Sequence, residues 1–429
     1  MNERRQRRVA LVSSEAIRPA MGGIGVRYLE LARRLPAFGF DVALISPGTA
    51  EQAVACGLEA GRVRSCAAGG WAGLLGDRDV AVAQGQLAND VALALPALPL
   101  AVDLYDPWLI ENLHYATDLG LDPWRNDHAS WVLQLARGDF FLCSSLEQRL
   151  FYLGFLTALG RVNPERLTAD PELAGLIGVV PFGLEGELPA PRPLLESRRP
   201  GERRLLFGGL YDWYDPWTAL AALERLADAA VTLWFVRNPN PASTPQRLFA
   251  AVESHCRTRG LWEGRVRALD WVPAERRFDL LREVDALVAT HAAGLETDLA
   301  MRTRFLDALA AGCPAVTSAG GAVARLLADR AAGWVVPVGD ADALAAALAE
   351  VLAGGEAVEA RIERGRGLAR EFSWERVLAP LVGFLERAAV DPTKERFAFR
   401  PPTVAPPDRL ASRARRWLLR PKGGGPGAS

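Results

Sequence analysis

Short apolar runs alternate with helical segments along most of the chain, and this alternation restricts the fold more than any other feature. In the first half, the predicted strands are Val9–Ser13, Asp41–Ile45, Val80–Ala83, Leu100–Leu104, Phe140–Cys143 and Gly178–Pro181. In the second half, they are Leu205–Phe207, Val231–Val236, Val266–Ala268, Ala286–Ala289, Ala315–Thr317 and Trp334–Val336. A helix between two strands makes them parallel and covers the sheet. The pattern predicts an α/β protein with two doubly wound, Rossmann-like domains.

A Pro-rich, charged stretch, Glu187–Arg203, separates the two alternations. We assign residues 1–190 to an N-terminal domain, 191–203 to a linker and 204–374 to a second domain. The chain has 429 residues, of which 50% are hydrophobic, so each domain is large enough for its own core. Doubly wound domains bind ligands beyond the carboxyl ends of their strands. The predicted ligand site is therefore a cleft between the domains.

Composition excludes several classes of protein. The net charge of -1 gives no general attraction for nucleic acid. The five cysteines contain no CxxC pair, which argues against a disulfide framework or a zinc site. No GxSxG, HExxH or Walker motif is present. The N-terminus is charged, without an apolar signal core, and no apolar run approaches the ~18 residues of a membrane span. We expect a cytoplasmic protein without a metal or cofactor.

The segment Leu295–Gly321, LETDLAMRTRFLDALAAGCPAVTSAGG, carries the strongest chemical signal. Arg302 and Arg304 stand at the start of a predicted helix, where the helix dipole disfavours cations by roughly 0.3–1 kcal/mol each. A bound diphosphate would remove this conflict. Asp307 follows on the same helix face and could hold ribose hydroxyls; the alternative is an Arg304/Asp307 surface pair. His291, just before this segment, is a candidate ligand of a sugar hydroxyl or phosphate, or a satisfied histidine at a strand end.

In each predicted domain, one glycine loop follows the first strand. In MGGIGVR, Gly22, Gly23 and Gly25 could bring backbone N–H groups close to a phosphate at a helix N-terminus. In FGGLYDWYDPW, the pair Gly208–Gly209 repeats this pattern, and Trp213 could stack on a base or sugar. The alternatives are a tight structural turn for the first loop and a core or interdomain role for Trp213.

These motifs together resemble glycosyltransferase family 4. The resemblance rests on GGIGVRYLELARRLPAFGFDVALISP, PFGL, the second glycine pair, FLDALAAGCPAVTSAGG and GWVVPVGDADALAAAL, which occur in this order. It implies a GT-B fold, with two Rossmann-like domains facing across a cleft, and a helix at 375–390 that returns to the N-terminal domain. The N-terminal domain would be the acceptor side and the second domain would bind the nucleotide sugar.

The resemblance also implies roles for particular residues. The family's ribose-binding acid matches Asp307, and its first glycine loop lies near the donor phosphates and the acceptor. Glu296 and Thr297 would belong to the donor site. Glu296 and Asp307 are, however, farther apart than the family's two acids. Arg302 and Arg304 lie within this longer interval.

The chain departs from the family at two further points. The family's Arg and Lys after the second glycine pair are missing, so we assign the phosphate contacts to Arg302 and Arg304, with Arg237 as a third candidate. The family's His in the first domain is replaced by the sequence DLYDPW, where Tyr105 or Asp106 would act near the reacting sugar. The alternative is that Asp103 and Asp106 cap a helix that begins near Pro107.

The resulting hypothesis is a glycosyltransferase of the hexosyl type in glycan or glycoconjugate biosynthesis. It would move a sugar from a nucleotide diphosphate donor to a hydroxyl of a glycan, lipid-linked or small-molecule acceptor, with retention and without a metal. Retention is expected because the first domain offers no His as a general base near the glycine loop. A nucleotide-sugar 2-epimerase and a non-catalytic sugar-binding or scaffolding protein of the same fold are the alternatives.

Residues 391–429 form a basic, Pro- and Gly-rich tail. Within it, Asp408–Arg420 has apolar residues on one side and arginines largely on the other. This segment could contact the inner face of an anionic membrane. A helix that docks on its own protein and a disordered tail are the alternatives.

Overall fold

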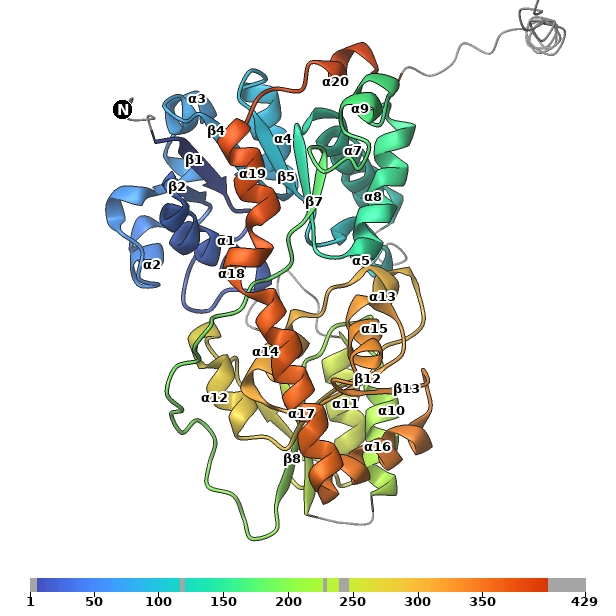
Figure 1. Ribbon diagram of the computed structural model, residues 1–429. Helices are drawn as coiled ribbons and strands as arrows, with labels where there is room; N and C mark the ends of the chain where they lie inside the picture. The colour runs from blue at the N-terminus through green and yellow to red at the C-terminus, as the bar shows by residue number, and fades with distance from the viewer. Residues whose placement is uncertain (1–5, 116–119, 227–229, 239–246, 400–429) are drawn as a thin grey trace, which may run out of the picture.

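A computed structural model describes residues 6–115, 120–226, 230–238 and 247–399 and contains two α/β domains (Figure 1). The first sheet has the order β3-β2-β1-β4-β5-β6-β7, and all its strand pairs are parallel. Its strands are β1 Arg8–Val12, β2 Asp41–Ser46, β3 Val63–Ser65, β4 Val80–Ala83, β5 Leu100–Asp103, β6 Phe140–Cys143 and β7 Ile177–Val179. The predicted fold class is confirmed. Strand β3 was not predicted, because its sequence VRS lacks an apolar run.

The second sheet has the order β10-β9-β8-β11-β12-β13 and is also parallel throughout. Its strands are β8 Arg203–Gly209, β9 Val231–Val236, β10 Val266–Leu269, β11 Ala286–Ala289, β12 Ala315–Ser318 and β13 Trp334–Val336. Central strands such as VAVA and ALVA are apolar at every position because helices cover both faces of each sheet.

Helices connect the strands in both domains. Those of the first domain are α1 Gly23–Arg34, α2 Ala50–Val54, α3 Trp71–Leu75, α4 Gly85–Ala94, α5 Trp108–Asn112, α7 Leu121–Arg137, α8 Leu146–Ala158 and α9 Pro164–Ala169. Those of the second domain are α10 Pro216–Arg225, α11 Arg247–Thr258, α12 Arg277–Arg282, α13 Leu295–Leu299, α14 Thr303–Ala311, α15 Gly321–Asp329, α16 Ala341–Ala353 and α17 Glu356–Ala369. None of the helices in the described part of the chain is long and apolar enough to cross a membrane.

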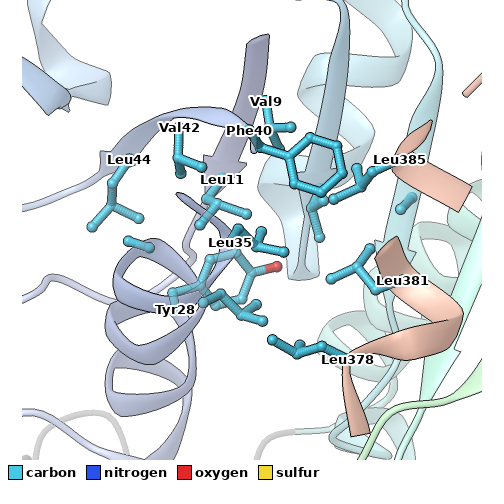
Figure 2. Packing of buried hydrophobic residues seen from close by; sticks show 14 of the residues in the cluster. Val9, Leu11, Tyr28, Leu35, Phe40, Val42, Leu44, Leu378, Leu381 and Leu385 are labelled. Carbon is cyan, nitrogen blue, oxygen red and sulfur yellow. The ribbon is translucent and has the colours of Figure 1, made fainter. Parts of the chain in front are cut away.

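The C-terminal helices pack on the first domain. Helices α18 Trp374–Val377 and α19 Ala379–Arg387 follow α17, and α20 Thr393–Arg396 comes after them (Figure 1). Leu378, Leu381 and Leu385 are fully buried and belong to the same core as Tyr28 of α1 (Figure 2). The amphipathic segment at 408–420 lies outside the described residues, so its predicted membrane contact stays a prediction.

The strand order reverses at one point in each sheet, and these points define where a ligand can bind. The first reversal lies between β1 and β4, and the second lies between β8 and β11. Crossover connections leave in opposite directions from such a pair of strands, which opens a crevice at their carboxyl ends. The loops after β1, β8 and β11 carry the two glycine motifs and the segment that begins at Leu295.

Candidate active site

A cleft of about 830 Å³ lies between the two domains, where these loops meet. The first domain contributes Glu15, Gly22, Gly23, Tyr105, Asp106 and Glu111 to its walls. The second domain contributes Tyr211, Trp213, Tyr214, Glu296, Arg302 and Arg304. The cleft therefore brings together the predicted arginines, the predicted acid-bearing loops and part of the first glycine motif.

Arg302 is the N-cap residue of α14, as its position at a helix start predicts, and makes no side-chain cap. The residue is only 9% exposed, and its Nη2 lies 2.7 Å from Oε2 of Glu296 on α13. Thr297 accepts a longer bond, 3.4 Å, from the same Nη2 and supports Glu296. The other oxygen of Glu296, Oε1, is buried and accepts no hydrogen bond among the described residues. This oxygen is an acceptor that a ligand hydroxyl could use.

Arg304, the second residue of α14, holds the second glycine loop. Its Nη1 donates to the carbonyl oxygens of Phe207 at 3.1 Å and Gly209 at 3.2 Å, and its Nη2 donates to the Tyr214 hydroxyl at 2.5 Å. Gly208 adopts φ +82°, and a Cβ there would lie 2.9 Å from Nη1 of Arg304. The glycine is therefore needed both for its backbone conformation and for the approach of the guanidinium.

Tyr214 lies between the two arginines. The guanidinium carbons of Arg302 and Arg304 lie 4.8 Å and 4.9 Å from the centre of its ring. The rings of Tyr211 and Trp213 stack beside it, 5.1 Å apart and nearly parallel. These aromatic faces offset part of the repulsion between two neighbouring cations. The arrangement gives the cleft a positive, aromatic wall suited to a phosphate ester that carries a planar base.

The first domain supplies an acidic wall. Burial, together with the carboxylates of Asp103 and Glu296, raises the pKa of Asp106 to about 6. Burial also raises the pKa of Glu111 well above its usual value, with Asp106 as the next cause. The pKa of Tyr105 is raised by burial as well. Asp106 can thus bind or release a proton near neutral pH, which is a property of general acids and bases.

Arg27 positions this acidic wall, a role that was not predicted from the sequence. It is 1% exposed, and its Nε and Nη2 donate to Asp103 at 2.7 Å and 3.3 Å. The guanidinium also lies 4.5 Å from the centre of the Tyr105 ring, and Asp103 accepts from the Tyr105 N–H. The helix-capping alternative is not observed for Asp103 or Asp106, because the N-cap of α5 is Pro107. The signal that could have revealed Arg27 is a charge on the apolar face of an amphipathic helix.

The first glycine loop already holds a carboxylate. Glu15 accepts from the N–H groups of Gly22 at 2.6 Å and Gly25 at 2.8 Å. Two of the amides at the start of α1 that we expected to contact donor phosphates are thus paired within their own domain. Gly22 and Gly23 line the cleft, whereas Gly25 packs against Met21. Glu15 itself was missed, and its signal is an acid between a strand and a glycine loop.

Several predicted site residues are not among those that line the cleft. Gly208 and Gly209 contact Arg304, and Thr297 contacts Glu296, so these three residues support residues that line the cleft. Arg237 is not brought to the cleft and instead packs over the ring of Phe249. Its proposed phosphate contact therefore has no support from the geometry.

Asp307 and His291 also lie outside the lining of the cleft. Nε of Arg277 on α12 donates to Asp307 at 3.1 Å, so the acid pairs with this arginine and not with Arg304. His291 is 2% exposed, and its backbone N–H donates to Ser318. Burial and then the two arginines lower its pKa well below the usual value, so the imidazole is neutral at pH 7. Its Nε2 has no hydrogen-bond partner among the described residues.

The described residues hold no group of three or more His, Cys, Asp or Glu side chains placed to bind a metal ion. The positive charge on the described walls of the cleft comes from arginine side chains, among them Arg302 and Arg304. The site can therefore bind an anion on the second domain and present carboxylates from both domains.

Part of the second half of the chain matches a described protein family. Residues 203–354 match the family model described as "Glycosyl transferases group 1". A curated relative, phosphatidyl-myo-inositol mannosyltransferase of Mycolicibacterium smegmatis, is 29% identical over 208 residues. That alignment covers 48% of this chain and 51% of the relative, so the chain spans about half the length of the curated relative it matches.

Solved structures resemble the chain over most of its length. HepE of Anabaena in complex with UDP-glucose has a TM-score of 0.66 at 16% identity, covering 89% of this chain and 99% of that chain. Sucrose-phosphate synthase of Thermosynechococcus elongatus has a TM-score of 0.63 at 17% identity, covering 89% and 98%. WaaG, a glycosyltransferase involved in lipopolysaccharide biosynthesis, has a TM-score of 0.57 at 15% identity, covering 89% and 99%. These likenesses show the fold, which is GT-B.

Proposed function

We propose that this protein is a glycosyltransferase that uses a nucleotide diphosphate sugar as its donor. The observation that carries the proposal is the pair Arg302 and Arg304 at the start of α14, which lines the interdomain cleft within the region that matches the glycosyl transferases group 1 model. Two guanidinium groups at a helix N-terminus attract a diphosphate more strongly than either feature alone.

The departure of the diphosphate is the step that these arginines would assist. When the bond between the sugar and the diphosphate breaks, negative charge grows on the leaving phosphate oxygen. Preorganised cations stabilise that charge without reorganisation, and one such donor is typically worth roughly 100- to 1,000-fold in rate. Arg302 and Arg304 are held in place by Glu296, Tyr214 and backbone carbonyls. We therefore expect activity to survive EDTA, and loss of activity that manganese or magnesium restores would contradict this part of the proposal.

The sugar would lie between the arginines and the acidic wall. The orphaned Oε1 of Glu296 is an acceptor for a sugar hydroxyl, and Asp106 lines the opposite side of the same cleft. The acceptor would enter along the first domain, beside Gly22 and Gly23. We keep Asp307 as a proposed ribose ligand; its carboxylate would have to exchange Arg277 for the ribose.

We further propose that the reaction proceeds with retention. In a retaining reaction the leaving phosphate can take the proton of the acceptor on the same face of the sugar, which makes stabilisation of the diphosphate the main task of the protein. Arg302 and Arg304 suit that task. NMR of the first-formed product from an α-linked donor should show an α linkage. A β linkage would instead assign Asp106 as the general base of an inverting reaction.

Release of nucleotide tests the activity itself. The protein would be incubated with UDP-glucose, GDP-mannose and related donors, with and without simple sugars and phosphatidylinositol vesicles as acceptors, and free nucleoside diphosphate would be measured. We expect release that depends on an acceptor and falls about 100-fold in Arg302→Met. Arg330→Met, which breaks only an exposed ion pair with Glu371, is the matched control. Isomerised donor without an acceptor would identify an epimerase, and binding without turnover would identify a non-catalytic protein.

A further inference from the structure

One buried side chain, Gln148 of α8, forms hydrogen bonds to both domains. It is 0% exposed. Its Nε2 donates to the carbonyl oxygen of Tyr105 at 2.9 Å and to the carbonyl oxygen of Leu299 at 2.9 Å. Its Oε1 accepts from the N–H of Ser144 at 2.8 Å. The orientation of the amide follows from these partners, since the reverse orientation would place Oε1 against two carbonyl oxygens.

The two carbonyl groups belong to the two walls of the cleft. Tyr105 directly precedes Asp106 in the first domain, and Leu299 is the last residue of α13, the helix that carries Glu296. A single amide therefore joins the backbone of the acidic loop to the backbone of the helix that pairs with Arg302.

Two neighbouring contacts join the same surfaces. The Tyr105 hydroxyl interacts with the side chain of Thr303, the first residue of α14. At the exposed edge, Glu147 of α8 pairs with Arg325 of α15. The amide of Gln148 differs from both contacts because it is completely buried and uses all its hydrogen-bonding groups. Losing it would leave two carbonyls without this donor, one in each domain.

We infer that Gln148 is a positioning residue that fixes Asp106 relative to Glu296 and Arg302 and thereby holds the two walls of the cleft in register. The inference rests on the proposed function for its effect on turnover. A glutamine that served only the first domain would satisfy its donors within that domain. Here one N–H pairs with a carbonyl that comes within reach only when the domains approach each other.

Gln148→Glu tests this inference because it keeps the shape of the side chain and the acceptor for Ser144. An ionised carboxylate cannot donate to either carbonyl, whereas a protonated one can donate to one of them. Near pH 8 the carboxylate is ionised, so we expect the reacting groups to be misplaced and kcat to fall at least about tenfold. As the pH is lowered and the carboxyl group is protonated, kcat should recover in part. The Kd for a nucleoside diphosphate such as UDP should stay within about twofold of the wild type, because Arg302 and Arg304 remain.

Gln134→Glu is the matched control. Gln134 is also a buried glutamine of the first domain, but its Nε2 donates to Gly85 of the same domain. Its substitution should lower stability without a pH-dependent recovery of kcat. Unchanged kcat in Gln148→Glu near pH 8, or the same pH-dependent recovery in Gln134→Glu, would overturn the inference. If Gln148→Glu does not fold, Gln148→Met removes the donors without adding a charge and should lower kcat at every pH.

A second readout does not depend on catalysis. Small-angle X-ray scattering should give a larger radius of gyration for Gln148→Met than for the wild type in saturating UDP, and no change for Gln134→Met. Equal radii for all three proteins would overturn the inference. If the wild type releases no nucleotide from any donor, the proposed function fails, while this comparison of radii still decides the role of Gln148.

Discussion

The two glycine loops of this protein both contain a Gly-Gly pair, but their backbones face charges of opposite sign. In the first domain, the N–H groups of Gly22 and Gly25 point at the carboxylate of Glu15. In the second domain, the carbonyl oxygens of Phe207 and Gly209 point at the guanidinium of Arg304. Each loop therefore pairs with a charge from its own domain, an anion in the first and a cation in the second.

This difference shows that a glycine motif by itself does not define an anion site. Glycine permits a close approach of the backbone, but the peptide orientation decides whether donors or acceptors face the ligand. The first loop has the donors, and Glu15 already uses two of them. The second loop has acceptors, and it serves the ligand indirectly by holding Arg304 at the cleft.

The largest effect is expected for Arg304→Met. The carbonyls of Phe207 and Gly209 and the Tyr214 hydroxyl would lose a charged donor, which should lower the free energy of unfolding by about 2–3 kcal/mol. Turnover should fall by about 100-fold or more, because a cation at the diphosphate is lost. Urea unfolding and nucleotide release measure the two effects. Arg330→Met should change stability by less than about 0.5 kcal/mol, and an equally small effect in Arg304→Met would refute the role of Arg304 in the second loop.

A smaller effect is expected for Glu15→Ala. The substitution removes the acceptor for the Gly22 and Gly25 amides at the start of α1, so stability should fall by about 1–2 kcal/mol. Phosphate should restore part of that loss in Glu15→Ala and have little effect on the wild type, because a free helix N-terminus binds anions. Urea unfolding with and without phosphate measures this. Stabilisation of the wild type by the same amount would mean that Glu15 does not occupy the anion position.

Two glycine-to-alanine substitutions distinguish the two loops by their effects on stability. Gly208→Ala should destabilise by roughly 1–2 kcal/mol, since its φ is +82° and a Cβ would meet Arg304. Gly23→Ala should be neutral or stabilise by up to about 1 kcal/mol, because no atom lies within 4 Å of its Cβ position and alanine favours the helix. Thermal unfolding of both variants measures the difference. Equal losses would show that the loops are constrained in the same way.

The effect that depends on pH concerns Asp106, which lines the cleft between the loops. Its pKa is raised to about 6 in the folded protein, so its proton is bound more tightly there than in the unfolded chain. The stability from this group is therefore present below about pH 4 and is lost as the pH rises through about 6. Asp106→Asn should remove this loss, so the melting temperature of the variant should fall less than that of the wild type as the pH rises from about 4 to 7. Melting temperatures at several pH values measure it, and identical pH profiles for variant and wild type would contradict the raised pKa.

The fold could be predicted from the sequence because its determinants are local. Apolar runs, helix spacing and chain breaks specify every strand except β3, whose three residues include Arg64 and Ser65. The position of Arg302 and Arg304 was also a local signal, since it depends on one helix start. Their ligand remains a prediction.

The partners of the site residues could not be predicted, because they are distant in the chain. Arg27 pairs with Asp103 over 76 positions, and Gln148 reaches Leu299 over 151. No periodic pattern links such residues, and only the packing of both domains brings them together. For Asp307, the spacing from Arg304 suggested an ion pair within one helix. The structure instead pairs Asp307 with Arg277 from another helix. Spacing within a helix says nothing about a competing partner from outside it.

The packing of α18 and α19 on the first domain has a consequence for the order of events during synthesis. Trp374, Leu378 and Leu385 belong to the hydrophobic core that also contains Val9 and Tyr28. Residues made before the second domain thus contribute to a core that is completed by residues made after it. The second domain has its whole sheet before these helices are made, so it can fold first and serve as the scaffold on which the N-terminal domain closes.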